Sequence, residues 1–120
     1  MRKFLVLFFS FVFSFVVTAA ETQLLRIHGS NTVGANLAPE LVLSWLLSKG
    51  YEVVLNKVTA KEERHISAIK QGDRLEVEIY AHGSSTSFKD FATGKTDVGM
   101  SSRRIKEKEI KKLSSLGALD

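Results

Sequence analysis

The sequence predicts an α/β fold in which a mainly parallel sheet is flanked by helices. The first observation is that segments with the pattern of strands alternate along the chain with segments of helical periodicity. The second is that three of the predicted strands end in a turn rich in glycine and hydroxyl residues. The third is the length of 120 residues, which allows one domain at most. Parallel strands need long crossover connections, and the intervening helices supply them.

Residues 1–20 have the form of a secretory signal peptide. Arg2 and Lys3 precede an apolar run from Phe4 to Val17, and the small residues at 18–20 offer cleavage after residue 19 or 20. The alternative is a membrane anchor, but this run of 14 residues is shorter than the roughly 20 that a spanning helix needs. We therefore expect a cleaved signal and a periplasmic protein, and a chain without cysteine fits that compartment.

Residues 21–120 form the predicted domain, which opens with a short strand followed by a helix. An apolar run predicts a strand that ends at Gly29 (Leu24, Leu25 and Ile27). Apolar residues then recur on one helical face: Leu37, Leu41, Val42, Trp45 and Leu46. Pro39 suits the first turn of this helix, and Lys49-Gly50 suits its end.

Two further strands are predicted in the middle of the domain. The segment Tyr51–Val58 is rich in β-branched residues and predicts a strand. The polar segment Thr59–Asp73 that follows is expected to be an excursion or a hairpin loop. Apolar residues at 75, 77, 79 and 81 then alternate with polar or amphipathic ones, which predicts a half-buried strand.

The last part of the domain is predicted to hold two helices around a brief strand. Ser84–Thr93 forms the first helix, with Phe88 and Phe91 on one side, and Asp97–Met100 forms the strand. Ile105–Ser114 forms a charged helix with three residues facing inward: Ile105, Ile110 and Leu113. The lysines and glutamates of this helix are typical of a solvated face, and docking of a partner is the alternative interpretation.

The composition excludes several classes of protein. Arg2 and Lys3 account for two of the 17 basic residues, so residues 21–120 hold 15 basic against 13 acidic side chains. Such a balance excludes a nucleic-acid binder driven by bulk charge. The absence of cysteine excludes a disulfide framework, a zinc finger and a thiol nucleophile. The residues call for no cofactor.

Three turns of one design predict a site for a small oxyanion. Each follows a predicted strand and precedes a predicted helix, and each combines glycine with hydroxyl residues; their candidate ligand residues are Ser30 and Thr32, then Ser84, Ser85 and Thr86, then Ser101, Ser102 and Arg103. The first N–H groups of a helix have no partner within it and attract anions. In a parallel sheet the three turns would lie at one edge. Hydroxyl groups would donate hydrogen bonds there, and Arg103 would be the cationic clamp.

Other interpretations of these residues stay open. Ser, Thr and Asn are the commonest helix N-caps, so any one such turn is ordinary capping. His28 and His82 precede the glycines and are expected to be packed or solvated, and no third ligand is spaced to form a metal site with them. His65 is expected to be exposed in the polar excursion. A secreted phosphatase would use Ser30 or Ser84 as nucleophile and His28 or His82 as base. A cell-envelope interaction protein with vestigial turns is the third alternative.

Three segments together resemble the periplasmic phosphate-binding proteins of ABC uptake systems. They are Leu25–Gly34, Ala81–Thr86 and Thr96–Arg103, and the likeness covers nearly all of residues 24–118. The closest similarity is to the branch often fused to an outer-membrane-protein-A-like, peptidoglycan-binding domain. The resemblance implies a lobe of a type II periplasmic binding protein, in which two lobes close on a dehydrated phosphate. This chain would be about the first half of such a domain.

The resemblance also implies roles for individual residues. Thr32 and the backbone of Val33 would contact the anion from the first turn, and Ser84 from the second. The family commonly has an aspartate in the third loop, where this chain has Ser102 followed by Arg103, and this departure bears on the preference for phosphate over sulfate. The implied partners are phosphate or a related oxyanion and an inner-membrane ABC permease. We expect a monomer that binds without catalysis and does not bind nucleic acid.

Overall fold

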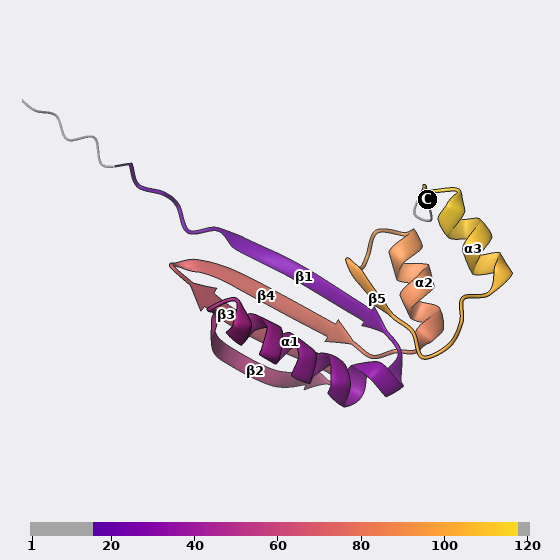
Figure 1. The fold of residues 1–120 in the computed structure, drawn as a ribbon, viewed down its shortest axis with the longest axis horizontal. Helices are drawn as coiled ribbons and strands as arrows, with labels where there is room; N and C mark the ends of the chain where they lie inside the picture. Colours follow the sequence, from indigo (N-terminus) through magenta and orange to yellow (C-terminus); the bar gives the residue numbers. More distant parts are fainter. Residues whose placement is uncertain (1–15, 118–120) are drawn as a thin grey trace, which may run out of the picture.

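A computed structural model describes residues 16–117 and has one five-stranded sheet with helices packed against it (Figure 1). Its elements in chain order are β1 (Thr22–Gly29), the π-helical turn η1 (Val33–Leu37), α1 (Ala38–Ser48), β2 (Glu52–Ala60), β3 (Glu63–Lys70), β4 (Asp73–Tyr80), α2 (Ser84–Ala92), β5 (Val98–Met100) and α3 (Glu107–Ser114). The predicted α/β class is therefore confirmed.

The sheet is mixed, so the prediction of a mainly parallel sheet is wrong. The strand order is β2-β3-β4-β1-β5. Both parallel pairs involve β1, which has β4 on one side and β5 on the other. The pairs β2–β3 and β3–β4 are antiparallel and form two successive hairpins. The parallel part nevertheless brings the carboxyl ends of β1, β4 and β5 to one edge, which is the arrangement that the predicted site requires.

Strand β3 occupies the segment that the sequence predicted to be a polar excursion or hairpin loop. Its central residues are buried, and it pairs with β4 from Glu63–Tyr80 to Lys70–Asp73. Gln71 and Gly72 form the two-residue connection, both with positive φ (51° and 88°). A tight hairpin of this kind needs positive φ at both positions, which glycine adopts without strain. The short Gln-Gly connection is thus what allows β3 and β4 to pair along their whole length.

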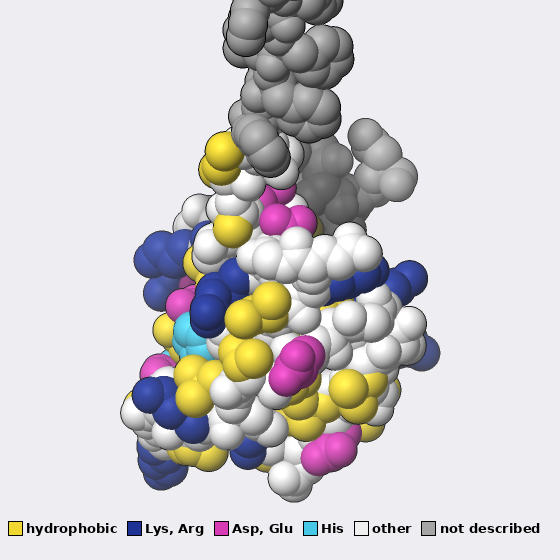
Figure 2. Space-filling view, turned by 90° about the vertical axis from the view of Figure 1, so that its left-hand side faces the viewer, with side chains coloured by type: hydrophobic (Ala, Val, Ile, Leu, Met, Phe, Trp, Pro, Cys, Tyr) yellow, Lys and Arg dark blue, Asp and Glu magenta, His cyan; other side chains and the backbone are white. Residues whose placement is uncertain are grey.

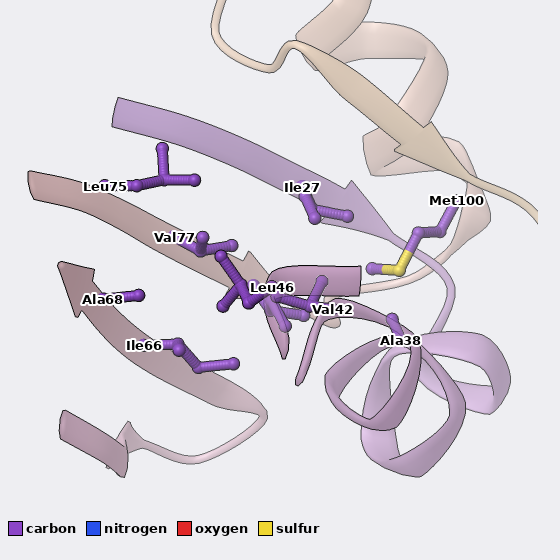
Figure 3. Close-up of a cluster of buried hydrophobic side chains, with 10 residues drawn as sticks. Ile27, Ala38, Val42, Leu46, Ile66, Ala68, Leu75, Val77 and Met100 are labelled. Carbon is purple, nitrogen blue, oxygen red and sulfur yellow. The ribbon is translucent and has the colours of Figure 1, made fainter. Parts of the chain in front are cut away.

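The hydrophobic core lies between α1 and one face of the sheet (Figure 3). Along β3 and β4, every second side chain, including Ile66 and Val77, points toward α1, where Leu46 is fully buried. The predicted apolar face of α1 is only partly correct. Val42 and Leu46 are buried, whereas three of its members are exposed: Leu37, Leu41 and Trp45. The stripe that contacts the sheet is therefore narrower than the apolar stripe in the sequence.

The start of the first helix is irregular for a local reason. Pro39 has no N–H to donate to the carbonyl four residues back, so the α-helical ladder is interrupted there. The N–H of Ala38 donates instead to the carbonyl of Val33, five residues back, as in a π-helical turn. Gly34 lies in this turn, and a Cβ added there would be 2.7 Å from the Cβ of Ala81. The turn therefore packs directly against the chain that leaves β4.

Helix α2 packs against β1 and β5, and α3 lies beside α2 (Figure 1). Phe88 is half-buried and Phe91 is exposed, so the aromatic side of α2 is only partly covered. Helix α3 begins at Glu107, not Ile105, and only Leu113 of the three residues predicted to face inward is buried, since Ile105 is half-buried and Ile110 is exposed. The third predicted strand-to-helix turn is thus a longer loop, because residues 101–106 separate β5 from α3.

The predicted signal peptide falls largely on residues 1–15, which lie outside the described residues. Residues 16–20 are exposed and have no regular secondary structure. Within residues 16–117, no helix has the length and apolar character needed to cross a membrane.

Candidate functional site

The three predicted turns meet at the carboxyl ends of β1, β4 and β5 (Figure 1). The N–H of Ser30 donates to the carbonyl of Met100 at 2.9 Å, which joins the first turn to the third. The N–H of Gly83 donates to the carbonyl of Gly29 at 2.7 Å, which joins the second turn to the first. These backbone bonds fix the relative positions of the helix starts at this edge.

The glycines at this edge serve packing. A Cβ at Gly29 would overlap the carbonyl oxygen of Met100 and lie 2.8 Å from the Cβ of Ser87. A Cβ at Gly99 would overlap the hydroxyl of Ser87 in the same way. Helix α2 therefore rests directly on the backbone of β1 and β5 through the buried Ser87. Glycine in a turn can let the backbone approach a ligand closely, but at these two positions it allows the close packing of a helix.

Ser84 and Ser102 form the centre of the candidate site. Their hydroxyl oxygens lie 3.3 Å apart, and the N–H of Ser102 donates to the Ser84 hydroxyl at 3.2 Å. Two hydroxyl groups carry two protons, and their mutual hydrogen bond uses one. The other proton has no acceptor among the described residues. The pair can therefore donate a hydrogen bond to an oxyanion at the start of α2.

Arg103 is held by the protein. Its Nη1 and Nη2 donate to the two carboxylate oxygens of Glu109 at 2.9 and 2.7 Å. Nη2 also donates to the Ser85 hydroxyl at 3.1 Å, and the guanidinium lies over the Phe88 ring, 5.1 Å from its centroid. The hydrogen bond and charge of Arg103 lower the pKa of Glu109 to about 2, and Glu109 raises the pKa of Arg103. Arg103 thus fixes α3 against α2 and positions Ser85, a role that the sequence did not indicate.

In the first turn Ser30 is an N-cap, and the hydroxyl of Thr32 is not used by the cap. Ser30 is buried, and its hydroxyl accepts the N–H of Val33 at 3.3 Å. The capping interpretation therefore applies to these two predicted site residues, because the N–H of Val33 already has an acceptor. Thr32 is exposed, and its side chain makes no hydrogen bond to any residue between 16 and 117. Of the predicted site residues in this turn, Thr32 is the one with a hydroxyl available to a ligand.

Two further predicted site residues stabilise their own turns. The Thr86 hydroxyl donates to the carbonyl of His82 at 3.2 Å. The Ser101 hydroxyl donates to the carbonyl of Arg103 at 2.6 Å and accepts the N–H of Arg103 at 3.2 Å. Because each hydroxyl has one proton, neither side chain retains a donor for an anion. Among the predicted hydroxyl groups that are not buried, those of Thr32, Ser85 and the Ser84–Ser102 pair retain a donor.

Each of the three histidines is paired with a carboxylate that its position in the sequence does not indicate. His28 is 6% exposed, and its Nδ1 lies 2.8 Å from Asp90 of α2. His82 lies 3.1 Å from Glu63 of β3. His65 contacts Glu76 and is half-buried, so the expectation that it is exposed is wrong. Burial raises the pKa of Glu76, but the combined effect of His65, Ser67 and Arg74 is greater and lowers it below its usual value.

The environment of His28 is that of a packed side chain. Its ring stacks on Tyr80, with centroids 4.7 Å apart, and its Nε2 is buried without a hydrogen-bond partner. No histidine nitrogen is hydrogen-bonded to a serine hydroxyl in the part of the chain that the structure describes, so the serine–histidine pairs considered above are not formed there. The same residues contain no group of three or more ligating side chains that could hold a metal ion.

A further ion pair fixes the start of β5. The Asp97 carboxylate accepts the backbone N–H of Arg26 at 2.8 Å and its Nη2 at 2.9 Å. These hydrogen bonds lower the pKa of Asp97 and raise that of Arg26. Thr96 adds a second link, since its hydroxyl lies 2.8 Å from the carbonyl of Arg26. Strand β5, which Ser102 follows by two residues, is thereby anchored to β1.

No protein-family model, curated protein or solved structure matches the chain. The likeness to phosphate-binding proteins therefore depends on the three sequence segments alone.

Acidification is expected to release α3 from α2 before the sheet unfolds. The carboxyl of Glu109 has its pKa lowered from 4.5 to about 2 by Arg103. The stabilisation from this pair is therefore complete above pH 4.5 and is lost as the pH falls from there toward 2. Hydrogen exchange of α3 amides, measured by NMR against pH, should show the loss of protection in that window.

The matched variants for this experiment are Glu109→Gln and Glu107→Gln, which remove the same charge from the first turn of α3. Glu107 is exposed and has no ion pair within residues 16–117. Glu109→Gln should reduce α3 protection already at neutral pH and remove its acid dependence, whereas Glu107→Gln should behave as the wild type. An identical acid profile in all three proteins would contradict the assigned role of Glu109.

Proposed function

We propose that this protein binds phosphate or a related tetrahedral oxyanion at the carboxyl ends of β1, β4 and β5. The observation that carries the proposal is the Ser84–Ser102 pair, which joins two turns at 3.3 Å and keeps one hydroxyl proton for a ligand. Helix α2 starts at Ser84, so its first N–H groups and its dipole favour an anion at the same position.

The donor set fits an anion that is recognised mainly by neutral groups. Hydroxyl donors are contributed by Thr32, Ser84, Ser85 and Ser102, while the guanidinium of Arg103 is neutralised by Glu109. Neutral hydroxyl and N–H donors can hold a partly or fully ionised oxyanion by hydrogen bonds alone. Ser102 can both donate and accept, which suits hydrogen phosphate as well as sulfate. Ser30, Val33, Thr86, Ser101 and Arg103 are positioning residues in this proposal.

The biological role follows from the resemblance of the three turns to those of periplasmic phosphate-binding proteins. In this proposal residues 21–120 are a lobe of a type II periplasmic binding protein, and residues 1–20 export it to the periplasm. The protein captures its anion without catalysis and passes it to an inner-membrane ABC permease. The second lobe of such proteins would close over the edge at which Ser84 and Ser102 lie.

The test is a titration of the purified protein with phosphate and with sulfate, followed by NMR. Saturable shifts of the Ser84, Ser85 and Ser102 amides are expected. Ser85 and Ser102 are exposed, so water competes for these donors and binding should be weak, in roughly the millimolar range. A phosphate-ester assay is run in parallel. Turnover of the ester, or the absence of shifts at these residues, would contradict the proposal.

Replacing Ser84 by alanine is expected to weaken phosphate binding by about 10- to 150-fold. The change removes a hydrogen bond to a charged group, worth roughly 1.5–3 kcal/mol. Ser48→Ala is the matched control, because Ser48 is an exposed serine that bonds a carbonyl of its own helix at the far end of α1. The control should bind as the wild type. If Ser84→Ala also retains wild-type affinity, Ser84 only stabilises the turn and the site lies elsewhere.

A further inference from the structure

A basic cleft lies between α2 and α3, beside the candidate site. Its volume is about 440 Å³, which is within the range of small-molecule sites. Helix α2 contributes Ser85, Phe88 and Lys89, and the other wall consists of Lys106 and the α3 residues Lys108, Glu109 and Lys112. We call this feature the lysine cleft. Both walls belong to elements that Arg103 and Glu109 hold together.

The lysine cleft carries a formal charge of four that the protein does not neutralise. None of the ammonium groups of Lys89, Lys106, Lys108 and Lys112 takes part in an ion pair within residues 16–117. The single carboxylate that lines the cleft, Glu109, is already bound by both terminal nitrogens of Arg103. The cleft therefore lacks an internal counter-ion.

This charge is concentrated locally. Residues 103–112 hold six basic and two acidic side chains. The rest of residues 21–120 therefore has a small excess of acidic side chains. At the opposite end of the molecule, basic, acidic and hydrophobic side chains are interspersed (Figure 2). Lys108 and Lys112 are one turn apart on α3, a spacing at which like charges destabilise a helix. An anion between them would relieve that repulsion.

The chemistry of the lining favours a phosphate group. Lysine ammonium groups are compact charges with rotatable donors, which suit phosphate oxygens without imposing the planar geometry of a carboxylate pair. The Ser85 hydroxyl accepts from Arg103 and keeps its own proton to donate. The half-buried Phe88 forms an apolar wall, which strengthens charge interactions beside it. We propose that the lysine cleft binds a small polyphosphate.

The test titrates protein expressed from the full sequence with tripolyphosphate in magnesium-free buffer at 0.15 M salt. Calorimetry measures affinity, and NMR identifies the residues that shift. The double charge reversal Lys108→Glu/Lys112→Glu should weaken binding at least tenfold. The control Lys57→Glu/Lys61→Glu makes the same change in net charge at exposed positions of the β2–β3 hairpin, at the other edge of the sheet, and should stay within twofold of wild type.

The outcomes separate this proposal from its alternatives and from the proposed function. Equal losses in both double variants would mean attraction by net charge alone and would overturn it. The absence of saturable binding by the wild type would also overturn it. Tighter binding of polyglutamate at the same residues would do the same, because it would indicate a surface for an acidic protein. The neutral pair Lys108→Gln/Lys112→Gln replaces the reversal if that variant unfolds. Shifts at Phe88 and Lys112 report on the cleft, whereas shifts at Ser102 with orthophosphate report on the other site.

Discussion

Replacing Gly29 by alanine should destabilise the protein by about 2–5 kcal/mol, a large part of the stability of a small domain. Gly29 has φ of 142°, which residues with a Cβ rarely adopt, and this strain costs about 1–2 kcal/mol. The added methyl would also overlap the carbonyl of Met100 and press on Ser87. Overpacking of this kind costs about 1–3 kcal/mol more, because it pushes β5 and α2 away from β1.

Gly72→Ala is the matched control, since Gly72 also has positive φ (88°) but no atom lies within 4 Å of its added Cβ. It isolates the backbone strain, and a loss of about 1 kcal/mol is expected. Urea unfolding followed by circular dichroism gives both values from the transition midpoints. Equal losses in the two variants would show that α2 and β5 do not pack on Gly29 as closely as described.

The parts of the fold that could be predicted from the sequence are those with a strong local pattern. Signals contained within a few residues predicted three elements: the strand that ends at Gly29, the alternating strand before Ala81, and the helix with Pro39 in its first turn. Strand β3 has no such signal. His65 and Ser67 alternate with the core residue Ile66, so they lie on the face of the sheet opposite α1, where Glu76 of β4 stabilises them. That pairing depends on register, which a polar segment does not reveal by itself.

The position of the candidate site could be predicted from the sequence, but the roles of some of its residues could not. Parallel pairing of β1 with β4 and β5 was enough to bring Ser84 and Ser102 to the same edge. The role of Arg103 depends on Glu109, which the loop after β5 places opposite it. The role of Ser30 is local, because its hydroxyl accepts the N–H of Val33 three residues along the chain, as the capping interpretation predicts. The role of Arg103 is set by partners on α2 and α3 that residue type alone does not specify.

The apolar stripe of α1 shows the same limit in the core. An apolar residue in a helical pattern predicts which side faces the protein, but the width of the covered face is set by the sheet beneath it. The sequence stripe includes Leu37, Leu41 and Trp45 together with the two residues that the structure buries. Only side chains that project between α1 and the strands lose their water, so burial divides neighbours that the pattern treats alike.

Leu46→Ala and Leu41→Ala measure this division directly, because they make the same change little more than one turn apart on α1. Leu46 is 0% exposed and packs against the sheet at the centre of the core, whereas Leu41 is 58% exposed (Figure 3). Leu46→Ala should cost about 2–5 kcal/mol, since it removes buried methyl groups and leaves a cavity. Leu41→Ala should cost less than about 1 kcal/mol, as is usual for exposed positions.

Urea unfolding of the two variants, with unchanged denaturant dependence, gives the comparison. A similar loss in both would mean that Leu41 is covered in the folded protein and that the sequence stripe, and not the narrower one, faces the core. A large loss confined to Leu46 supports the packing of α1 on the sheet.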